Sequence, residues 1–373
     1  MQQCPILLDQ SPSRRSLAAI LAVPALARAQ PAELRILALL PLTGALGVLG
    51  DETCRGLELA ADERVNAPRF RVVRADAPDA AQGVAELRRM LAERPAAVFG
   101  SVSSAIALAT TQAAEAAGLP FFELNAVADN IIDRGLRQLW RLGPGAAQLG
   151  AAVAGAMGTT LPGLLGEPLE AMRVVIFGGG GASSDAVCNA AEASLAAIGI
   201  APAGRFNAPA GEIGHAVQRL RSLSADLLLH TGSEGEIAAL FRGFREEGWR
   251  PRLVVGIAGG HAVADTARAA GEGHDGTLVI DLPPVPPGHP FTDAYRRRYG
   301  AAPRSGHSLA AFSLARPVMD ALRGPDLRQG MMAVDLPEGT LANGWGLRMD
   351  ARQQNLRAMP VLSRWDHGVL GPL

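Results

Sequence analysis

Lysine is absent from this chain of 373 residues, so arginine supplies all 35 of its basic side chains. Without lysine, the protein can contain neither a Schiff-base lysine nor the phosphate-binding lysine of a P-loop. Net charge is nearly absent as well, with a formal value of −1 at neutral pH. A chain with so little charge imbalance gives no electrostatic reason to expect nucleic acid or an anionic membrane surface as a partner.

Cysteine pairs, clustered histidines and nucleophile motifs are also missing. The three cysteines, Cys4, Cys54 and Cys188, form no CxxC pair, which argues against thiol redox chemistry and structural zinc. Cys54 and Cys188 fall within helical patterns in separate halves of the chain, which favours two buried thiols over the alternative of one disulfide. The seven histidines have no metal-ligand spacing, and no GxSxG motif is present. We therefore expect no metal, no cofactor and no catalytic residue.

Apolar runs long enough to span a membrane are absent, but the N-terminus carries a shorter one. Two arginines at 14–15 precede the apolar stretch 17–26, and Ala27-Arg28-Ala29 has the small-x-small form of a cleavage site. This order predicts an export signal peptide over residues 1–29; a mobile tail or a short buried helix is the alternative. Both the twin-arginine and the general secretory routes stay open. Because Cys4 lies before the apolar run and not at the cleavage point, we expect a free, soluble mature chain.

From residue 34 onward, short apolar runs alternate with longer amphipathic stretches. The first strand is predicted at 34–40, and apolar residues then recur at helical spacing from 54 to 65. The same unit repeats, and this alternation is typical of an α/β fold with parallel sheets and helices on both faces. The further predicted strands span 70–73, 96–99, 120–124, 173–177, 225–230, 253–255 and 276–281.

The strands form two series, separated after residues 137–142. A proline-rich stretch at 283–287 is where we expect a return crossing between two lobes. The tail, 344–365, alternates in the manner of β-strands. Open parallel sheets bind ligands outside the carboxyl ends of their strands. Two sheets that face each other would therefore line one cleft with their strand-end loops.

Several short motifs follow one another in a fixed order along the mature chain. The motifs are Leu39-Leu40-Pro41-Leu42-Thr43-Gly44, Leu49-Gly50, Gly56-Leu57-Glu58-Leu59-Ala60, Asp76, Phe99-Gly100-Ser101-Val102-Ser103-Ser104, Gly118-Leu119-Pro120-Phe121, Gly344-Trp345-Gly346, Gln354-Asn355, Pro360-Val361 and Trp365. No single motif is specific. In order and spacing, however, they resemble those of the periplasmic branched-chain amino acid binding proteins, and the likeness runs over nearly the whole mature chain.

The resemblance implies a type I periplasmic solute-binding protein of an ABC importer, with two doubly wound parallel-sheet lobes joined by a hinge of three crossover strands. We place residues 30–140 and 282–345 in the N-terminal lobe, and residues 141–281 and 346–373 in the C-terminal lobe. The expected partners are a small-molecule ligand and the transporter permease subunits, and the expected state is a monomer. Such a protein performs no chemistry; its ligand favours hinge closure because it contacts both lobes only in the closed state.

In the amino acid binders that the chain resembles, the serine that ends the glycine loop helps to hold the ligand carboxylate. Ser104 occupies that position, with Ser103 beside it. A hydroxyl group and free amides at a helix N-terminus accept an anion without a formal charge; alternatively, Ser104 is only the helix N-cap. The remaining ligand-binding positions that the resemblance indicates are Leu49, Asn125, Ala126, Val127, Ser183, Ser233, Glu234 and Ala258.

Two of these positions bear on the nature of the ligand. Leu49 stands where the relatives cover the ligand with an aromatic side chain, and Ala258 aligns with the acid that pairs the ligand's ammonium group. A buried ammonium without a counter-charge is costly. Either Glu234 or Glu123 replaces the acid, or the ligand is not an α-amino acid. We favour the second alternative, which implies a carboxylate, an amide or another small polar organic compound.

Other signals favour structural interpretations or rival functions. The glycine run 178–181 lacks the last glycine and the acidic partner of a dinucleotide fingerprint, so we interpret it as a flexible loop. Asp76 ends a predicted strand and could be a cleft residue, but we favour a role in fixing a loop or capping the following helix. His230 ends a predicted strand and could reach the cleft. The rival functions are a periplasmic ligand-sensing module for a receptor and a hydrolase built around Ser104 and a cleft histidine.

Overall fold

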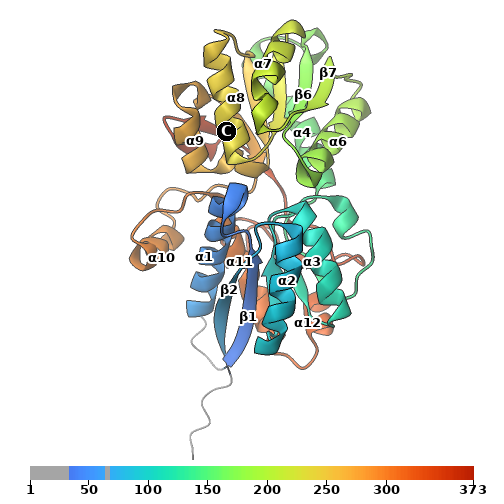
Figure 1. Ribbon diagram of the computed structural model, residues 1–373, viewed down its shortest axis with the longest axis vertical. Coiled ribbons are helices and arrows are strands. Elements are labelled where there is room, and N and C mark those ends of the chain that lie inside the picture. The colour runs from blue at the N-terminus through green and yellow to red at the C-terminus, as the bar shows by residue number, and fades with distance from the viewer. Residues whose placement is uncertain (1–32, 64–67) are drawn as a thin grey trace, which may run out of the picture.

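The computed structural model describes residues 33–63 and 68–373, which form two lobes stacked along the long axis of the molecule (Figure 1). The predicted signal peptide, residues 1–29, lies outside the described residues. The first lobe contains a five-stranded sheet in the order β2-β1-β3-β4-β5, and all neighbouring pairs are parallel, as expected. Its strands are β1 (Glu33–Leu40), β2 (Arg69–Asp76), β3 (Ala97–Gly100), β4 (Phe121–Glu123) and β5 (Leu139–Arg141).

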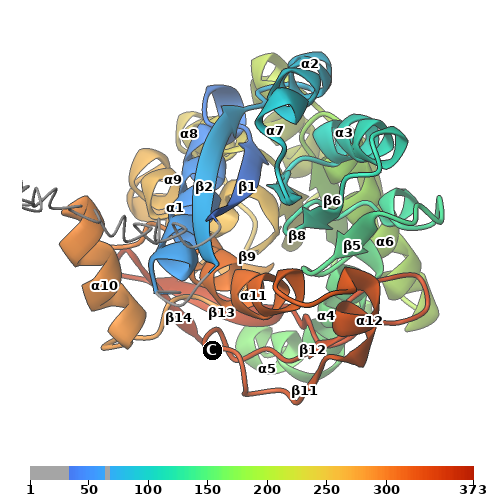
Figure 2. The same cartoon turned by 90° about the horizontal axis from the view of Figure 1, so that it is seen from below.

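Helices cover both faces of this sheet because successive side chains of a strand point to opposite sides. Ile36 and Ala38 of β1 pack with α1 and α11, whereas Leu37 and Leu39 pack with α2 and α3. Viewed from below, α2 and α3 lie on the opposite side of the sheet from α11 and α12 (Figure 2). The helices of this lobe are α1 (Gly47–Asp62), α2 (Ala80–Met90), α3 (Ser104–Ala116), α10 (Pro290–Tyr299), α11 (Gly306–Leu322) and α12 (Leu327–Ala333).

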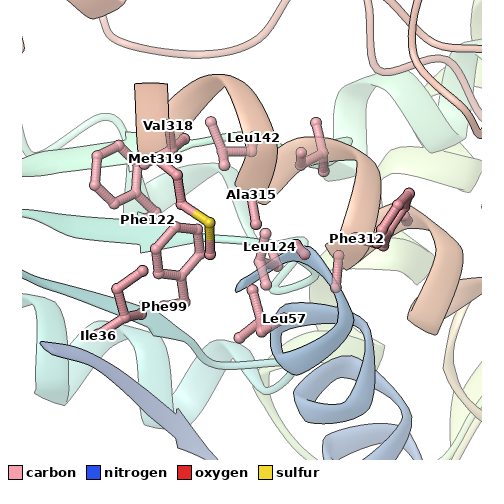
Figure 3. Packing of buried hydrophobic residues seen from close by; sticks show 14 of the residues in the cluster. Ile36, Leu57, Phe99, Phe122, Leu124, Leu142, Phe312, Ala315, Val318 and Met319 are labelled. Carbon is pink, nitrogen blue, oxygen red and sulfur yellow. The ribbon is translucent and has the colours of Figure 1, made fainter. Parts of the chain in front are cut away.

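The core between the sheet and α11 shows how the last third of the chain completes the first lobe. Phe99 and Phe122 stack with ring centroids 5.2 Å apart, and Val318 and Met319 of α11 belong to the same buried cluster (Figure 3). Leu57 of α1 closes the cluster from the other end. Residues far apart in sequence therefore form one continuous apolar core, which stabilises the lobe by removing that surface from water.

The second lobe contains a seven-stranded sheet in the order β14-β13-β10-β9-β8-β6-β7. Five neighbouring strands, β7, β6, β8, β9 and β10, are parallel, and all of them except β7 were predicted. The C-terminal tail adds β13 and β14 in antiparallel pairing. The strands that we did not predict are β5, β7, β11 and β14. The strands are β6 (Val174–Gly178), β7 (Gly204–Asn207), β8 (Leu227–Thr231), β9 (Leu253–Ile257), β10 (Leu278–Asp281), β13 (Val361–Asp366) and β14 (Val369–Pro372); β11 (Asp335–Leu336) and β12 (Leu347–Arg348) form a small separate sheet.

The second sheet is also covered on both faces. Val174 and Ile176 of β6 face the core under α4 and α6, and Val175 and Phe177 face the core under α7 and α8. This alternation matches the doubly wound arrangement expected from the sequence. The helices of this lobe are α4 (Ala146–Thr159), α5 (Leu161–Leu165), α6 (Ala182–Ala197), α7 (Ile213–Ser222), α8 (Glu234–Glu246) and α9 (Ala264–Ala270).

The chain passes between the lobes three times, and the three segments lie side by side. Arg141 forms a parallel bridge with Gln354, and Asp281 pairs with Val361 across the antiparallel ladder. Leu347, Met349 and Ala358 belong to the core of the first lobe. We therefore propose a lobe boundary between Ala358 and Val361, later than the boundary after residue 345 that we placed from the sequence.

Two smaller expectations concern the thiols and the membrane. Cys54 lies in the core of the first lobe and Cys188 in that of the second, and both are free and buried, which confirms the interpretation as separate thiols. Burial raises the pKa of each thiol to about 12. Among the described residues, no helix combines the length and apolar character needed to cross a membrane.

The close crossing of α1 and α11 gives a test of this packing. A Cβ atom at Gly56 would overlap the main-chain oxygen of Ser308, so Gly56→Ala should lower the free energy of unfolding by about 1–3 kcal/mol. Gly155, on the exposed face of α4, has no atom within 4 Å of such a Cβ. As the matched control, Gly155→Ala should raise the free energy of unfolding by about 0.5–1 kcal/mol. Chemical denaturation measures both, and a stability loss at Gly155 equal to that at Gly56 would contradict the argument.

Candidate functional site

A cavity of about 310 Å³ lies where the strand-end loops of the two lobes face each other. Its volume is at the lower end of the range for small-molecule sites. Most of its wall is aliphatic, and no arginine from the described part of the chain lines it. The lining residues are Ala45, Leu46, Leu49, Val102, Ser103, Ala105, Asn125, Val127, Leu282 and His307 on the first-lobe side, and Pro144, Leu149, Gly180, Gly181, Ala182, Ser183, Ser184, Val187, Thr231, Gly232, Ser233, Glu236, Ala258, Gly259 and Asp281 on the second-lobe side.

The structure brings seven of the ten predicted site residues to this cavity. The three that do not line it are Ser104, Ala126 and Glu234, all of which lie close behind its walls or rim. The seven residues at the cavity are Leu49, Ser103, Asn125, Val127, Ser183, Ser233 and Ala258.

Ser104 connects the two lobes instead of facing the cavity. It is fully buried as the first residue of α3, and its main-chain amide donates to Ser183 Oγ at 3.0 Å. Ser183 in turn donates to Ser104 Oγ, which also accepts from the amide of Ala128. The helix N-cap is Ser103, whose hydroxyl makes no capping bond. The alternative that Ser104 is the N-cap is therefore wrong by one residue, and Ser103 is the α3 serine that lines the cavity.

Glu123 organises the first-lobe wall from beneath. Its carboxylate, which is fully buried, accepts from Ser101 N at 2.6 Å, Asn125 N at 3.1 Å and Ala126 N at 2.9 Å, and also from the Ser101 hydroxyl. Burial raises its pKa, and these hydrogen bonds act in the opposite direction. Both carboxylate oxygens are committed to the loops after β3 and β4, so Glu123 is not the replacement counter-charge that the sequence left open.

Glu236 has the corresponding role in the second-lobe wall. It accepts from Ser233 N at 2.7 Å, from Ser233 Oγ at 2.9 Å and from Gly180 N at 3.1 Å. Glu234, the acid expected at the site, lies outside the cavity. Burial and the nearby charge of Asp265 raise the pKa of Glu234, and Arg304 opposes them. The acid that lines the cavity on α8 is therefore Glu236.

Asp76 and His230 lie outside the cavity. Asp76 accepts from Leu42 N at 2.9 Å and from the Thr43 hydroxyl at 2.7 Å. It therefore fixes the loop after β1, which is the loop-fixing role that we expected. His230 is buried in the second lobe, where its Nδ1 lies 2.7 Å from His261 Nε2. Burial lowers the pKa of His230 to about 3. The hypothesis that His230 reaches the cleft is wrong because its ring packs into the sheet core.

Besides Glu236, two further titratable residues at the cavity were missed from the sequence: Asp281 and His307. Asp281 ends β10, and its Oδ1 accepts from Leu282 N at 2.8 Å, whereas its Oδ2 is buried without a partner. Burial raises the pKa of Asp281 to about 7. His307, in the first turn of α11, is 4% exposed, its Nδ1 has no partner, and burial lowers its pKa to about 4. The rule that strand ends face the cleft would have found Asp281; no sequence signal distinguishes His307.

The two sheets with facing loops and the cavity between them define the periplasmic binding protein class. The chain matches the periplasmic binding protein family over residues 33–338 and belongs to that family. It is a solute-binding protein and not an enzyme, as the resemblance noted in the sequence implied.

One relative and two solved structures show how similar the chain is to individual binding proteins. The chain is similar to the Leu/Ile/Val-binding protein homolog 7 of Brucella melitensis biotype 1, at 32% identity over 379 aligned positions that cover 95% of this chain and 94% of the relative. The fold is that of the leucine binding protein LivK from Thermotoga maritima, with a TM-score of 0.77, 18% identity, and coverage of 91% of this chain and 97% of that one. A solute binding protein from R. palustris in complex with benzoate gives a TM-score of 0.73 at 18% identity, covering 92% and 96%.

The buried carboxyl group of Asp281 predicts a specific pH dependence of stability. Its pKa is about 7 when folded and near 3.9 when unfolded, so between these values the folded protein binds more protons and loses stability as the pH rises. Asp281→Asn removes this loss. The variant should therefore gain stability relative to the parent by up to about 1.4 kcal/mol per pH unit from pH 4 to 7, and the gain should be constant above pH 7.

Urea denaturation at a series of pH values measures this gain. The exposed Asp366 serves as the control position, and Asp366→Asn should follow the parent curve. Parallel curves for the parent and Asp281→Asn would contradict the assigned burial.

Proposed function

We propose that this protein is the extracytoplasmic solute-binding component of an ABC importer, and that it captures a small polar organic ligand in the cavity between its lobes. On this proposal, residues 1–29 direct export to the periplasm and are removed. The mature protein acts as a monomer and delivers its ligand to the permease subunits of the transporter.

The observation that carries the proposal is that one cavity takes its walls from both lobes. The Ser104–Ser183 hydrogen bonds cross between α3 and α6 next to this cavity. A ligand that touches both walls therefore binds fully only when the lobes are together. Its binding free energy shifts the equilibrium towards closure, which is the signal that a transporter requires.

The chemistry of the walls supports a ligand with an apolar body and an anionic end. The starts of α3 and α6 present amides and hydroxyls at residues 102–105 and 180–184, where the helix dipoles favour negative charge. Aliphatic side chains such as Leu49, Leu149 and Val187 surround the rest of the cavity. The named ligands of the relatives, leucine and benzoate, are both carboxylates with an apolar body.

The hydrolase alternative has no geometric support. Ser104 Oγ is bonded to Ser183 and to the amide of Ala128, and no imidazole accepts its proton. A sensing module would use the same cavity and differ only in its partner. Co-purification with the permease subunits is the observation that separates transport from sensing.

A thermal-shift screen of the mature protein tests the proposal. The compounds are leucine, isoleucine, valine, benzoate, and the amides of these acids. At least one carboxylate should raise the unfolding temperature, because a ligand at a hundred times its Kd stabilises the folded state by about 2.7 kcal/mol. Absence of any shift, or release of a chemically altered compound after denaturation, would contradict a binding role.

The contact between the lobes gives a second prediction. Ser183→Ala removes both hydrogen bonds to Ser104 and should weaken ligand binding by about two- to tenfold per lost bond, since each contributes about 0.5–1.5 kcal/mol. Isothermal titration calorimetry with a ligand from the screen measures the effect. Ser222→Ala, an equivalent change at an exposed position on α7, should leave the affinity unchanged. Equal affinities for Ser183→Ala and the parent would show that these bonds do not contribute to closure.

A further inference from the structure

A second contact between the lobes lies away from the cavity, at Arg304. This residue belongs to the segment of the first lobe that joins α10 to α11. Its main-chain oxygen accepts a hydrogen bond of 2.8 Å from the amide of Ala264, the first residue of α9 in the second lobe. The first amides of a helix have no acceptor within the helix, so Arg304 supplies what α9 lacks. Neither residue lines the cavity, and the contact therefore joins the lobes without touching a ligand.

This contact and the one between Ser104 and Ser183 lie on opposite sides of the molecule. In Figure 1, α9 of the second lobe lies over α1 at the left, whereas α6 lies over α3 at the right. Figure 2 shows the same separation from below. The serine contact crosses between α3 and α6, and Arg304 is bonded to α1. The lobes are therefore held together at two separate places.

Arg304 is fixed by its own lobe. Glu52 of α1, which is fully buried, accepts from Arg304 N and from Arg304 Nε, each at 3.0 Å, and Asp51 accepts from Arg304 Nη2 at 2.6 Å. Tyr295 of α10 also donates to Glu52. Because all these partners belong to the first lobe, Arg304 is held in place before the lobes meet. Closure then costs little conformational entropy at this residue.

The second lobe presents two acids to the guanidinium group of Arg304. Asp265 Oδ2 lies 3.8 Å from Arg304 Nε, while Asp265 Oδ1 pairs with Arg268 of its own helix. Burial and the charge of Asp265 raise the pKa of Glu234, and Arg304 acts in the opposite direction. Asp265 Oδ2 and Glu234 Oε1 are buried, with no hydrogen-bond partner within residues 33–63 and 68–373. Arg304 therefore brings positive charge to two acids that their own lobe leaves partly unpaired.

We propose that Arg304 and Ala264 form an interlobe latch, which stabilises the closed state and so sets how tightly the protein holds its ligand, although neither residue contacts the ligand. The main-chain hydrogen bond supplies the larger part, because the ion pair with Asp265 is too long for a hydrogen bond. A contact made only in the closed state strengthens ligand binding by as much as it favours closure. The proposal rests on the proposed function, since it requires a ligand that binds between closed lobes.

Ala264→Pro tests the latch with little effect on the fold. Proline has no N–H, and its ring would lie where the amide hydrogen now points at Arg304, so the variant removes the bond and blocks the contact. Proline is favoured at the first position of a helix, and Val263 before it has φ −101° and ψ 127°, the extended conformation that a following proline requires.

The matched control is Ala80→Pro, at the first residue of α2. Asp79 before it is also extended, with φ −144° and ψ 174°. Among the residues that the structure describes, the amide of Ala80 has no acceptor and makes no contact with the other lobe. Both variants should therefore unfold, without ligand, at a temperature close to that of the parent.

Calorimetric titration of the mature protein with leucine and with benzoate measures the effect. Ala264→Pro should bind the compound that the parent binds about tenfold more weakly, because it loses the bond and gains a steric conflict, whereas Ala80→Pro should match the parent. Equal affinities for Ala264→Pro and the parent overturn the latch and leave the solute-binding function standing.

Hydrogen exchange of the parent, followed by NMR, tests the same bond without a substitution. The Ala264 amide has no acceptor within α9, so its protection reports the contact with Arg304. It should exchange more slowly when the ligand is bound, and the Ala80 amide should not change. An Ala264 rate that the ligand does not alter overturns the latch.

Failure of both compounds to bind the parent counts against the proposed function, and X-ray scattering of the ligand-free proteins then decides the latch. Ala264→Pro should have a larger radius of gyration than the parent, since its lobes close less. Equal radii overturn the proposal.

Discussion

Backbone amides at the ends of parallel strands need acceptors, and carboxylates supply them in both walls of the cleft. Glu123 joins the loop after β3 to the loop after β4, and Glu236 joins the start of α8 to the loop after β6. Because each carboxylate holds two loops at once, the loops of a wall are fixed relative to each other. The shape of the cavity therefore depends on two acids that need no ligand to stay in place.

The same side-chain chemistry has a different role at Asp281. A carboxylate that is fully bonded to its own chain is structural, whereas one with an unpartnered oxygen at a cavity is available to a second molecule. Asp76, Glu123 and Glu236 belong to the first kind, whereas Asp281 at the cavity and Glu234 beside it each keep one buried oxygen without a partner. Counting hydrogen bonds to each oxygen separates these roles, although the sequence shows only Asp or Glu at the end of an element in each case.

Most of the fold was predictable because buried parallel strands are continuous apolar runs that alternate with amphipathic helices. The strand β7 was missed because Gly204–Asn207 includes glycine, arginine and asparagine and carries no such pattern. We propose a later lobe boundary near the C-terminus than the one placed from the sequence, because Leu347, Met349 and Ala358 pack in a core formed far away in sequence. Local pattern identifies an element, but it does not say which lobe the element joins.

The site was predictable to the extent that strand order fixes which loops face each other. Seven expected positions reached the cavity, but side-chain direction within the first turn of a helix decided the rest. Ser103 faces the cavity and Ser104, one residue later, faces the other lobe. Side-chain direction in the first turn of α8 likewise places Glu236 at the cavity and Glu234 outside it. His307 could not be found from the sequence because its place depends on the contact of α11 with the crossing at Pro283.

The three crossings that lie side by side also restrict how the lobes can move. Arg141 pairs with Gln354, and Asp281 pairs with Val361, so the connecting segments form a strip and not a single flexible tether. A strip bends easily across its width but resists twisting and sliding within its plane. Opening is thereby reduced to essentially one angular coordinate, and one distance between spin labels placed on opposite lobes would describe the entire motion.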